Sequence, residues 1–258
     1  MTDEERFDEI LGELRELLLD LGALSTPVML IGGQVLALES KRRGGSGVIA
    51  VETDTGVAVE RGFSFEPDLL FDMDGSEFMA GRLPEVFSER GFSRRSKGYR
   101  WSKDLPSGQR MDLDLFAPGD VEVDALPTQM TPLLDSRVAL RRSQQVSLTV
   151  GGKSLAILLP DAVGFLTMKE RAKREHRPEK SKDSFDMFVY VKLVGAQSTR
   201  EALDSAGDEG ERLRARLKTL FWSRDAAGVQ DVLTYASQHS SDEQELLAQA
   251  VVDLFDEL

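Results

Sequence analysis

The chain has 258 residues, of which 41% are hydrophobic and 30% are charged, so it is long enough for one large domain or two smaller ones. It contains no cysteine, which excludes disulfides, cysteine-ligated zinc and thiolate nucleophiles. Its formal net charge of −13 argues against a generally basic nucleic-acid-binding protein, because neutralisation of phosphates supplies most non-specific affinity.

The first 24 residues predict an amphipathic helix, because their apolar side chains recur at helical spacing on one stripe. The stripe consists of Phe7, Ile10, Leu11, Leu14, Leu17 and Leu18. This segment begins acidic and lacks the positive start and apolar core of a signal peptide. No stretch of the sequence approaches the roughly 18 uninterrupted apolar residues of a membrane span. We therefore expect a cytoplasmic protein with no membrane partner.

A strand, a glycine pair and a helix follow Pro27. Residues 28–31 (VMLI) predict a short buried strand, Gly32 and Gly33 a turn, and the next ten residues a helix. Backbone N–H groups at such a glycine pair can approach a phosphate closely, although most pairs of this kind are only tight turns. After a Gly-rich connection, the β-branched residues of segment 48–60 predict a second strand.

A helix and a hairpin are predicted next. Residues 76–90 have a helical pattern that ends at Gly91, in the way that C-cap glycines end helices. Residues 93–101 and 110–117 predict two strands joined by a loop. Alternation along the second strand places Asp112 and Asp114 on one face and two leucines on the other.

The last hundred residues have a different pattern from the rest. Residues 146–159 predict two strands that turn at a Gly-Gly pair, and every later element is helical. The predicted helices are 161–175, 184–194, 199–223, 226–237 and 242–258. We therefore predict an α+β protein, with an α/β core at residues 1–160 and a C-terminal helical domain at residues 161–258.

The predicted strands carry two pairs of acidic residues, Glu52 with Asp54 and Asp112 with Asp114. Within each pair, the two residues are two positions apart. Such side chains share a face about 6 to 7 Å apart, a spacing that can bracket two Mg²⁺ ions. In a chain with 45 acidic residues, a solvated face is the competing interpretation. The acidic segment 68–75 has a spacing similar to that of a calcium loop but lacks the distal glutamate.

The segment 169–182 gathers seven lysines and arginines against three glutamates. It is either a local RNA-binding patch or a solvated helix face of mixed charge.

The order of these motifs resembles the AbiEii-type nucleotidyltransferases over most of residues 28–194. Members of that family have a strand ending in Gly-Gly or Gly-Ser, a strand with an Asp-x-Asp pair and a strand with a third Asp before Leu-x-Ala-Pro. A helical Lys followed by a Lys-Asp-x-x-Asp-Leu motif completes the pattern. The matching segments are LIGGQVLALE, TDTGVAV, SERGF, RMDLDLFAPGD and LLPDAVGFLTMKERAKREHRPEKSKDSFDMFVYVKL. The resemblance implies a nucleotidyltransferase-fold mixed sheet with flanking helices, followed by a helical domain.

The resemblance also implies an activity and its residues. The activity would be the Mg²⁺-dependent transfer of a nucleoside monophosphate from an NTP to an acceptor, either tRNA or a protein hydroxyl. The chain would then be the toxin of a toxin-antitoxin pair, with RNA bound at the Lys169–Lys182 patch and an antitoxin protein as partner. The implied residues are Asp54 and Asp114 for the metal, Gly32, Gly33 and Lys169 for the nucleotide, and Asp183 and Asp186 for the walls of the cleft.

One departure from the family pattern leaves two alternatives open. In the best alignment, Asp54 occupies the first carboxylate position and Gly56 the second, so one metal ligand is missing. A shifted alignment uses Glu52 with Asp54, so that the metal set becomes Glu52, Asp54, Asp112 and Asp114. The chain is thus either an active enzyme with a rebuilt site or a degenerate protein that binds nucleotide or a protein partner without catalysis.

Overall fold

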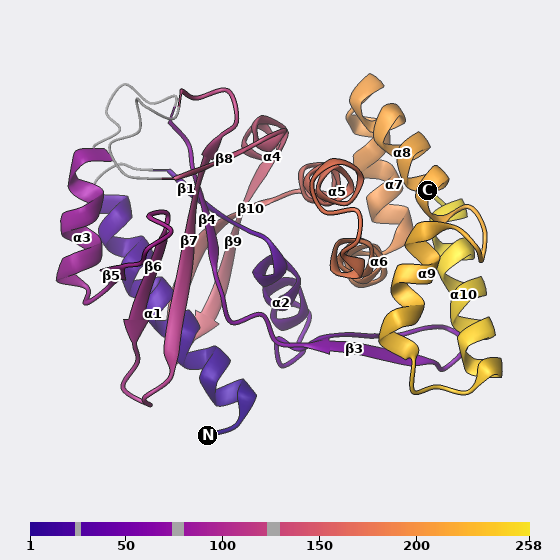
Figure 1. Cartoon of the computed structure of the whole chain (residues 1–258), viewed down its shortest axis with the longest axis horizontal. Coiled ribbons are helices and arrows are strands. Elements are labelled where there is room, and N and C mark those ends of the chain that lie inside the picture. Colours follow the sequence, from indigo (N-terminus) through magenta and orange to yellow (C-terminus); the bar gives the residue numbers. More distant parts are fainter. Residues whose placement is uncertain (24–26, 74–79, 123–129) are drawn as a thin grey trace. The chain divides into compact units, whose positions relative to one another are not determined.

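A computed structural model of the chain describes residues 1–23, 27–73, 80–122 and 130–258 (Figure 1). The chain divides into two compact units. The first contains residues 1–47 and 63–160, and the second contains residues 48–62 and 161–258. The second unit therefore includes the segment Val48–Gly62 in addition to the region predicted as the helical domain.

The first unit is built on a mixed sheet, which confirms the predicted architecture. The strands run in the order β5-β6-β7-β4-β1-β10-β9, and β8 pairs with β7. Their bounds are β1 Val28–Ile31, β4 Asp68–Phe71, β5 Ser93–Arg94, β6 Arg100–Asp104, β7 Arg110–Pro118, β8 Thr131–Leu133, β9 Ser143–Val150 and β10 Lys153–Pro160. Strand β1 is parallel to β10, β4 is parallel to β7, and the predicted hairpin β9–β10 is antiparallel. The single strand predicted at residues 93–101 is divided into β5 and β6 by a turn in which Gly98 adopts φ 69°, and β6 pairs antiparallel with β7.

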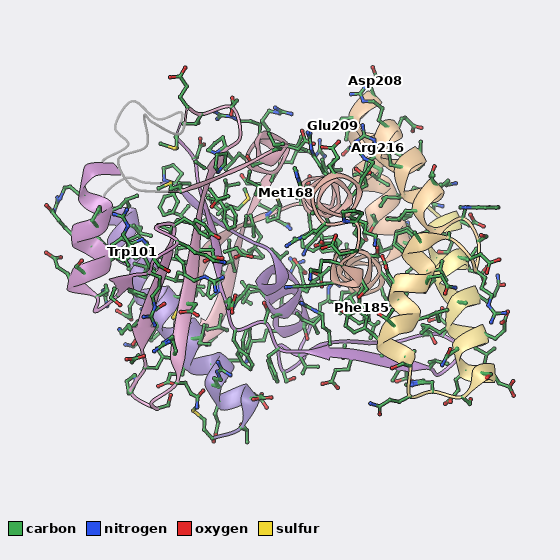
Figure 2. All side chains as sticks on the ribbon, viewed as in Figure 1. Trp101, Met168, Phe185, Asp208, Glu209 and Arg216 are labelled. Carbon is green, nitrogen blue, oxygen red and sulfur yellow. The ribbon has the colours of Figure 1, made fainter. Side chains whose placement is uncertain are left out.

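Helices cover this sheet and supply much of its core. They are α1 Asp3–Ala23, α2 Gly33–Arg42, α3 Leu83–Glu89 and α4 Ser136–Arg141. Helix α1 buries the predicted apolar stripe, with the difference that Leu21 is buried whereas Leu18 is partly exposed. Trp101 of β6 stacks on Phe87 of α3, with ring centroids 5.0 Å apart (Figure 2).

The helix predicted at residues 76–90 is shorter in the structure. A 3-10 turn at Ala80–Arg82 precedes α3, and Gly91, with φ 81°, follows its end as predicted. The predicted positions 76–79 lie outside the described residues.

The second unit is mainly helical, as predicted for the C-terminal region. Its helices are α5 Ala162–Arg171, α6 Ser181–Val194, α7 Ala196–Ser205, α8 Asp208–Phe221, α9 Ala227–Leu233 and α10 Ser241–Asp256, with a π-helical turn at Ala172–His176 and a 3-10 turn at Thr234–Ala236. The prediction of a single helix at 199–223 was wrong, because Gly207 adopts φ 56° and separates α7 from α8. Throughout the described ranges, no helix has the length and apolar character that crossing a membrane requires.

A hairpin replaces the single strand predicted at residues 48–60. Strands β2 (Ile49–Glu52) and β3 (Ala58–Gly62) pair antiparallel and form a separate two-stranded sheet. The chain reverses because Gly56 adopts φ 82° and the Thr53 hydroxyl accepts a hydrogen bond from the Val57 N–H at 3.1 Å. Asp54 consequently lies in a turn, and it does not share a strand face with Glu52.

Candidate functional site

The turn between β1 and α2 requires a glycine for two separate reasons. Gly32 adopts φ 73° and ψ −153°, a backbone region that is essentially restricted to glycine. A Cβ atom at this position would also lie only 2.0 Å from Asp68 Oδ2. The missing side chain therefore makes room for the Asp68 carboxylate, directly before the N-terminus of α2.

Strand register brings Asp68 into line with two other charged residues. Asp68 of β4 pairs with Ile31 of β1 on one side and with Asp114 of β7 on the other, and Asp114 pairs in turn with Arg100 of β6. Paired residues on neighbouring strands share a face of the sheet, and the strands lie about 4.7–4.9 Å apart. Asp68, Asp114 and Arg100 thus form one line of side chains across the middle of the sheet, which we call the central row.

The guanidinium of Arg100 makes a bidentate contact with the carboxylate of Asp114. Its Nε donates to Asp114 Oδ1 at 2.6 Å, and its Nη2 donates to Asp114 Oδ2 at 2.7 Å and to Glu66 Oε2 at 3.3 Å. The hydrogen bond to Asp114, with smaller contributions from the charges of Glu66 and Asp112, raises the pKa of Arg100 above its already high value. The side chains of Arg100 and Asp114 are 27% and 14% exposed, so water and solutes reach this pair.

Asp112 faces the same way two positions earlier in β7, as its alternation with Leu113 predicted. It accepts a hydrogen bond from the hydroxyl of Ser102, its partner on β6. That hydroxyl also accepts a hydrogen bond from Arg95 Nε at 2.8 Å. Asp112 is therefore held by a neutral hydroxyl, whereas Asp114 is held by a charged guanidinium.

The central row fits a hard divalent cation only in part. Within the described ranges, no three Asp, Glu, His or Cys side chains already converge on one metal position. Both oxygens of Asp114 are directed at Arg100. Mg²⁺ does not require a complete protein cage, because it is usually bound by one or two carboxylates together with water and substrate phosphates. Asp68 and Asp114 are two such carboxylates, and each would have to exchange its present contacts for the cation, which for Asp114 means release by Arg100.

Asp68 and Glu66 were not predicted as site residues. They stand two positions apart, immediately before the buried residues Leu69, Leu70 and Phe71. The sequence signal for these two residues is an acidic pair placed directly before an apolar run. The acidic spacing of segment 68–75, of which residues 74 and 75 lie outside the described ranges, is instead similar to that of a calcium loop.

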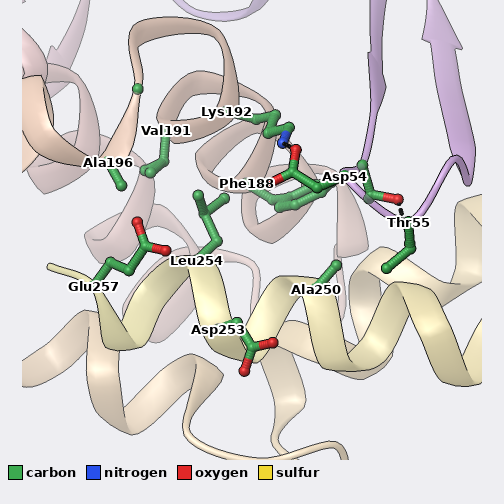
Figure 3. A pocket seen from close by; sticks show the side chains of 12 residues that line it. Asp54, Thr55, Phe188, Val191, Lys192, Ala196, Ala250, Asp253, Leu254 and Glu257 are labelled. Carbon is green, nitrogen blue, oxygen red and sulfur yellow. Dashed lines mark hydrogen bonds and ion pairs between the residues drawn. The ribbon is translucent and has the colours of Figure 1, made fainter.

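Asp54 lies in the second unit and has a different environment (Figure 3). Its side chain is 94% exposed and forms an ion pair with Lys192 of α6. The two residues help to line a cavity of about 370 Å³, whose wall also includes Asp253 and Glu257 from the C-terminal end of the chain. Glu52 is exposed at the end of β2, and the shared metal site of Glu52 and Asp54 with Asp112 and Asp114 stays a prediction.

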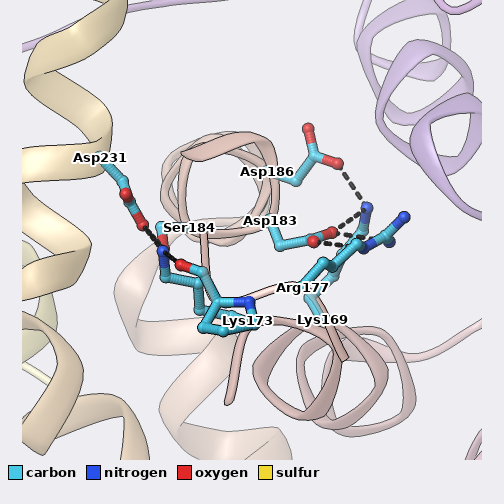
Figure 4. Close-up of polar contacts among 8 residues, drawn as sticks. Lys169, Lys173, Arg177, Asp183, Ser184, Asp186 and Asp231 are labelled. Atoms are coloured by element: carbon cyan, nitrogen blue, oxygen red, sulfur yellow. Dashed lines mark hydrogen bonds and ion pairs between the residues drawn. The ribbon is translucent and has the colours of Figure 1, made fainter. Parts of the chain in front are cut away.

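Lys169, Asp183 and Asp186 meet in a buried group of charges in the second unit (Figure 4). Lys169 Nζ donates to Asp186 Oδ2 at 2.5 Å and to Asp183 Oδ1 at 3.3 Å. The side chain of Lys169 is 7% exposed, and those of the two aspartates are 0% exposed. We call these three residues, together with Arg61 and Arg177, the Lys169 cluster.

Two arginines complete the cluster from different elements. Arg177 Nε lies 2.7 Å from Asp183 Oδ2, and Arg61 Nε at the end of β3 lies 3.3 Å from Asp186 Oδ1. Neither of these two contacts has the alignment of a hydrogen bond, but Arg177 Nη2 donates a hydrogen bond to Asp183 Oδ1 at 3.0 Å. Both aspartates are thus engaged by cations of their own unit, and the predicted contact of Lys169 with a nucleotide stays a prediction.

Other cations of segment 169–182 are also paired with carboxylates. Lys173 Nζ lies 2.6 Å from Asp231 Oδ2, and Arg174 Nε lies 2.7 Å from Glu170 Oε1. Arg171 Nε lies 2.7 Å from Glu175 Oε2. Much of the positive charge in the sequence is therefore offset locally, and its use for binding RNA stays a prediction.

Comparison with known proteins gives a structural likeness. No family model and no curated protein matches the chain. Among solved structures, it is similar to the crystal structure of an antigenic nucleotidyltransferase-like protein from Paracoccidioides brasiliensis. The identity is 18%, the match covers 82% of this chain and 93% of the other, and the TM-score is 0.46. At this TM-score, the likeness decides neither the fold family nor the function of this chain.

Proposed function

We propose that the chain binds a nucleoside triphosphate with Mg²⁺ in its first unit and transfers the nucleoside monophosphate to an acceptor hydroxyl. The acceptor oxygen forms a bond to the α-phosphorus, the bond to the β-phosphate breaks, pyrophosphate leaves and the hydroxyl proton passes to water. The observation that carries this proposal is the central row beside Gly32. A helix N-terminus preceded by glycine favours phosphate, and carboxylates in register beside it favour a divalent cation. Nucleotidyl transfer depends mainly on positioning and charge neutralisation of this kind.

Each residue has a defined part in the proposal. Gly32 and Gly33 allow the backbone at the start of α2 to approach the triphosphate closely. Asp68 and Asp114 would hold Mg²⁺, and the ion would supply charge neutralisation at the phosphates. Glu66 and Asp68 provide the acidic pair, two positions apart, that segment TDTGVAV lacks because of Gly56. This assignment replaces Asp54 with Asp68 as the proposed metal ligand.

The test compares three aspartates of the same chain. Binding of the four NTPs is measured by calorimetry with and without Mg²⁺, and transfer is measured with radiolabelled NTPs in the presence of total RNA or lysate. Wild type and Asp54→Asn should both bind in an Mg²⁺-dependent manner and form a labelled product. Asp68→Asn and Asp114→Asn should do neither. Loss confined to Asp54→Asn would restore the assignment made from the sequence, and the lack of product with all four nucleotides would contradict transfer.

A second candidate is a protein that binds nucleotide, or a protein partner, without catalysis. The position of Arg100 favours it, since a guanidinium already satisfies both oxygens of Asp114. This candidate predicts that NTP affinity is unchanged by EDTA, whereas the enzyme predicts a large decrease. The same calorimetric titration therefore separates the two.

The acceptor and the biological role follow only from the resemblance to AbiEii-type proteins. On that basis we propose tRNA or a protein hydroxyl as acceptor, and a toxin that an antitoxin protein neutralises. Induced expression of the chain should then arrest growth, and Asp68→Asn should not. Normal growth during expression of the active enzyme would contradict the toxin role without affecting the proposed chemistry.

A further inference from the structure

Arg100 occupies the carboxylate that the cation needs, and this contact is the starting point for a second proposal, which rests on the function proposed above. We propose that Arg100 couples nucleotide binding to metal binding. In the nucleotide-free protein it holds Asp114 and Glu66. In the nucleotide complex its guanidinium moves to the triphosphate and releases the carboxylates to the cation.

The geometry of Arg100 suits both partners in this exchange. Its bidentate contact with Asp114 uses the planar fork of the guanidinium, which matches carboxylate and phosphate oxygens equally well. The Arg100 side chain is 27% exposed and Glu66 is 58% exposed, so a bound triphosphate can reach the guanidinium without unfolding of the sheet. Arg100 is also two strands away from Asp68, in the same row, so it starts close to the proposed site.

The charges of the site explain why the exchange requires both ligands. Glu66, Asp68 and Asp114 carry three negative charges, and a triphosphate would be repelled if it met them alone. A cation alone must displace a bidentate arginine before it reaches Asp114. When both ligands bind, the guanidinium gains phosphate oxygens and the cation gains carboxylates, so every charge has a partner.

This coupling has a measurable form. Thermodynamic linkage requires that nucleotide increases metal affinity by the same factor by which metal increases nucleotide affinity. Loss of Arg100 should increase affinity for the cation alone, because its competitor is gone. It should also reduce the factor by which nucleotide improves that affinity.

The experiment measures Mn²⁺ binding by electron paramagnetic resonance in the full chain, with and without α,β-methylene analogues of the four NTPs. In Arg100→Met, we expect Mn²⁺ alone to bind about tenfold more tightly than in wild type, since a charge-assisted pair no longer competes. Arg100→Lys should be intermediate, because it keeps the charge but loses the fork.

Arg94→Met is the matched control. Arg94 is exposed on β5 and pairs with Trp101 next to Arg100, so its substitution removes the same charge without touching Asp114.

The possible results separate the two proposals. Equal Mn²⁺ affinity in wild type and Arg100→Met, or an equal increase in Arg94→Met, would overturn the coupling role and leave the proposed function intact. Absence of Mn²⁺ binding in every variant, with and without nucleotide, would overturn both. Circular dichroism establishes that each variant is folded. If Arg100→Met does not fold, the comparison of Arg100→Lys with wild type decides in the same way.

Discussion

The central row of the first unit and the Lys169 cluster of the second are both groups of cations and aspartates, but they differ in burial. Asp183 and Asp186 are fully buried, whereas Asp114 and Arg100 are 14% and 27% exposed. Removing one partner of a buried pair leaves a charge that water cannot solvate, so that breaking the pair strongly destabilises the fold. A pair that water reaches can exchange its partner for a ligand at much lower cost. Burial therefore predicts a large loss of stability when one partner of the cluster is removed, and a small loss when one partner of the row is removed.

The largest expected effect on the free energy of unfolding is that of a substitution at Lys169, at the centre of the Lys169 cluster. Lys169→Met should destabilise the protein by about 3–5 kcal/mol, because two buried aspartates lose their shared ammonium group. Urea unfolding measures the change. The control is Lys180→Met at an exposed lysine of the same segment, with an expected change within about 0.5 kcal/mol. A loss below about 1 kcal/mol for Lys169→Met would contradict the structural role of the cluster.

The next effect tests the glycine beside the central row. Gly32→Ala should cost about 2 kcal/mol of unfolding free energy, because its backbone conformation is essentially restricted to glycine. It should also weaken Mn²⁺ binding, since the new methyl group collides with Asp68. Gly56→Ala is the matched control: Gly56 has φ 82°, but a methyl group there would meet no atom of the described residues within 4 Å beyond its chain neighbours. If both variants bind Mn²⁺ equally, the position of Asp68 against Gly32 is unimportant for the cation.

A smaller effect on stability is expected at Asp114. Asp114→Asn should cost only about 1 kcal/mol, because the pair with Arg100 is partly exposed. The same variant should nevertheless lose Mn²⁺ binding, whereas Lys169→Met should retain it under conditions where it is folded. Urea unfolding and Mn²⁺ titration of the two variants measure both properties. If Asp114→Asn lowered the free energy of unfolding as much as Lys169→Met does, the central row and the Lys169 cluster would not differ in their contribution to stability.

The smallest effect is expected at Asp54. Asp54→Asn should change stability by less than about 0.5 kcal/mol, because an exposed ion pair contributes little. Thermal unfolding and Mn²⁺ titration should both match wild type. A substantial decrease of Mn²⁺ affinity would show that the aspartate chosen from the sequence, and not Asp68, belongs to the metal site.

Local patterns were sufficient for much of the fold and for part of the site. The buried strand before Gly32, the alternation around Asp114 and the turn at Gly151–Gly152 all depend on neighbouring residues, and the structure has each of them. Strand β4 is as short as β1, but it begins with an aspartate and no glycine pair or helix pattern follows it directly. Strand β4 places Asp68 in the central row through its register with β1 and β7. This register depends on segments that are distant in the sequence, so local spacing cannot predict it.

The difference between Asp54 and Asp68 has the same physical origin. Both Glu52-x-Asp54 and Glu66-x-Asp68 place two acids two positions apart, and spacing alone cannot rank them. The turn at Thr53–Gly56 and the register of Asp68 distinguish them, because the first exposes its aspartate and the second places it beside Gly32.

The hairpin of residues 48–62 also imposes an order on folding during synthesis. Its valines Val51, Val57 and Val59 are buried, and Arg61 pairs with Asp186 of α6, which the ribosome makes much later. At about 5–20 residues per second, the roughly 125 residues between Arg61 and Asp186 take about 6–25 s to follow. Over that interval the hairpin has emerged without its helices, and its apolar face is open to chaperones or to other nascent chains. The second unit can close only after translation has passed α6, although its first strand is made before most of the first unit.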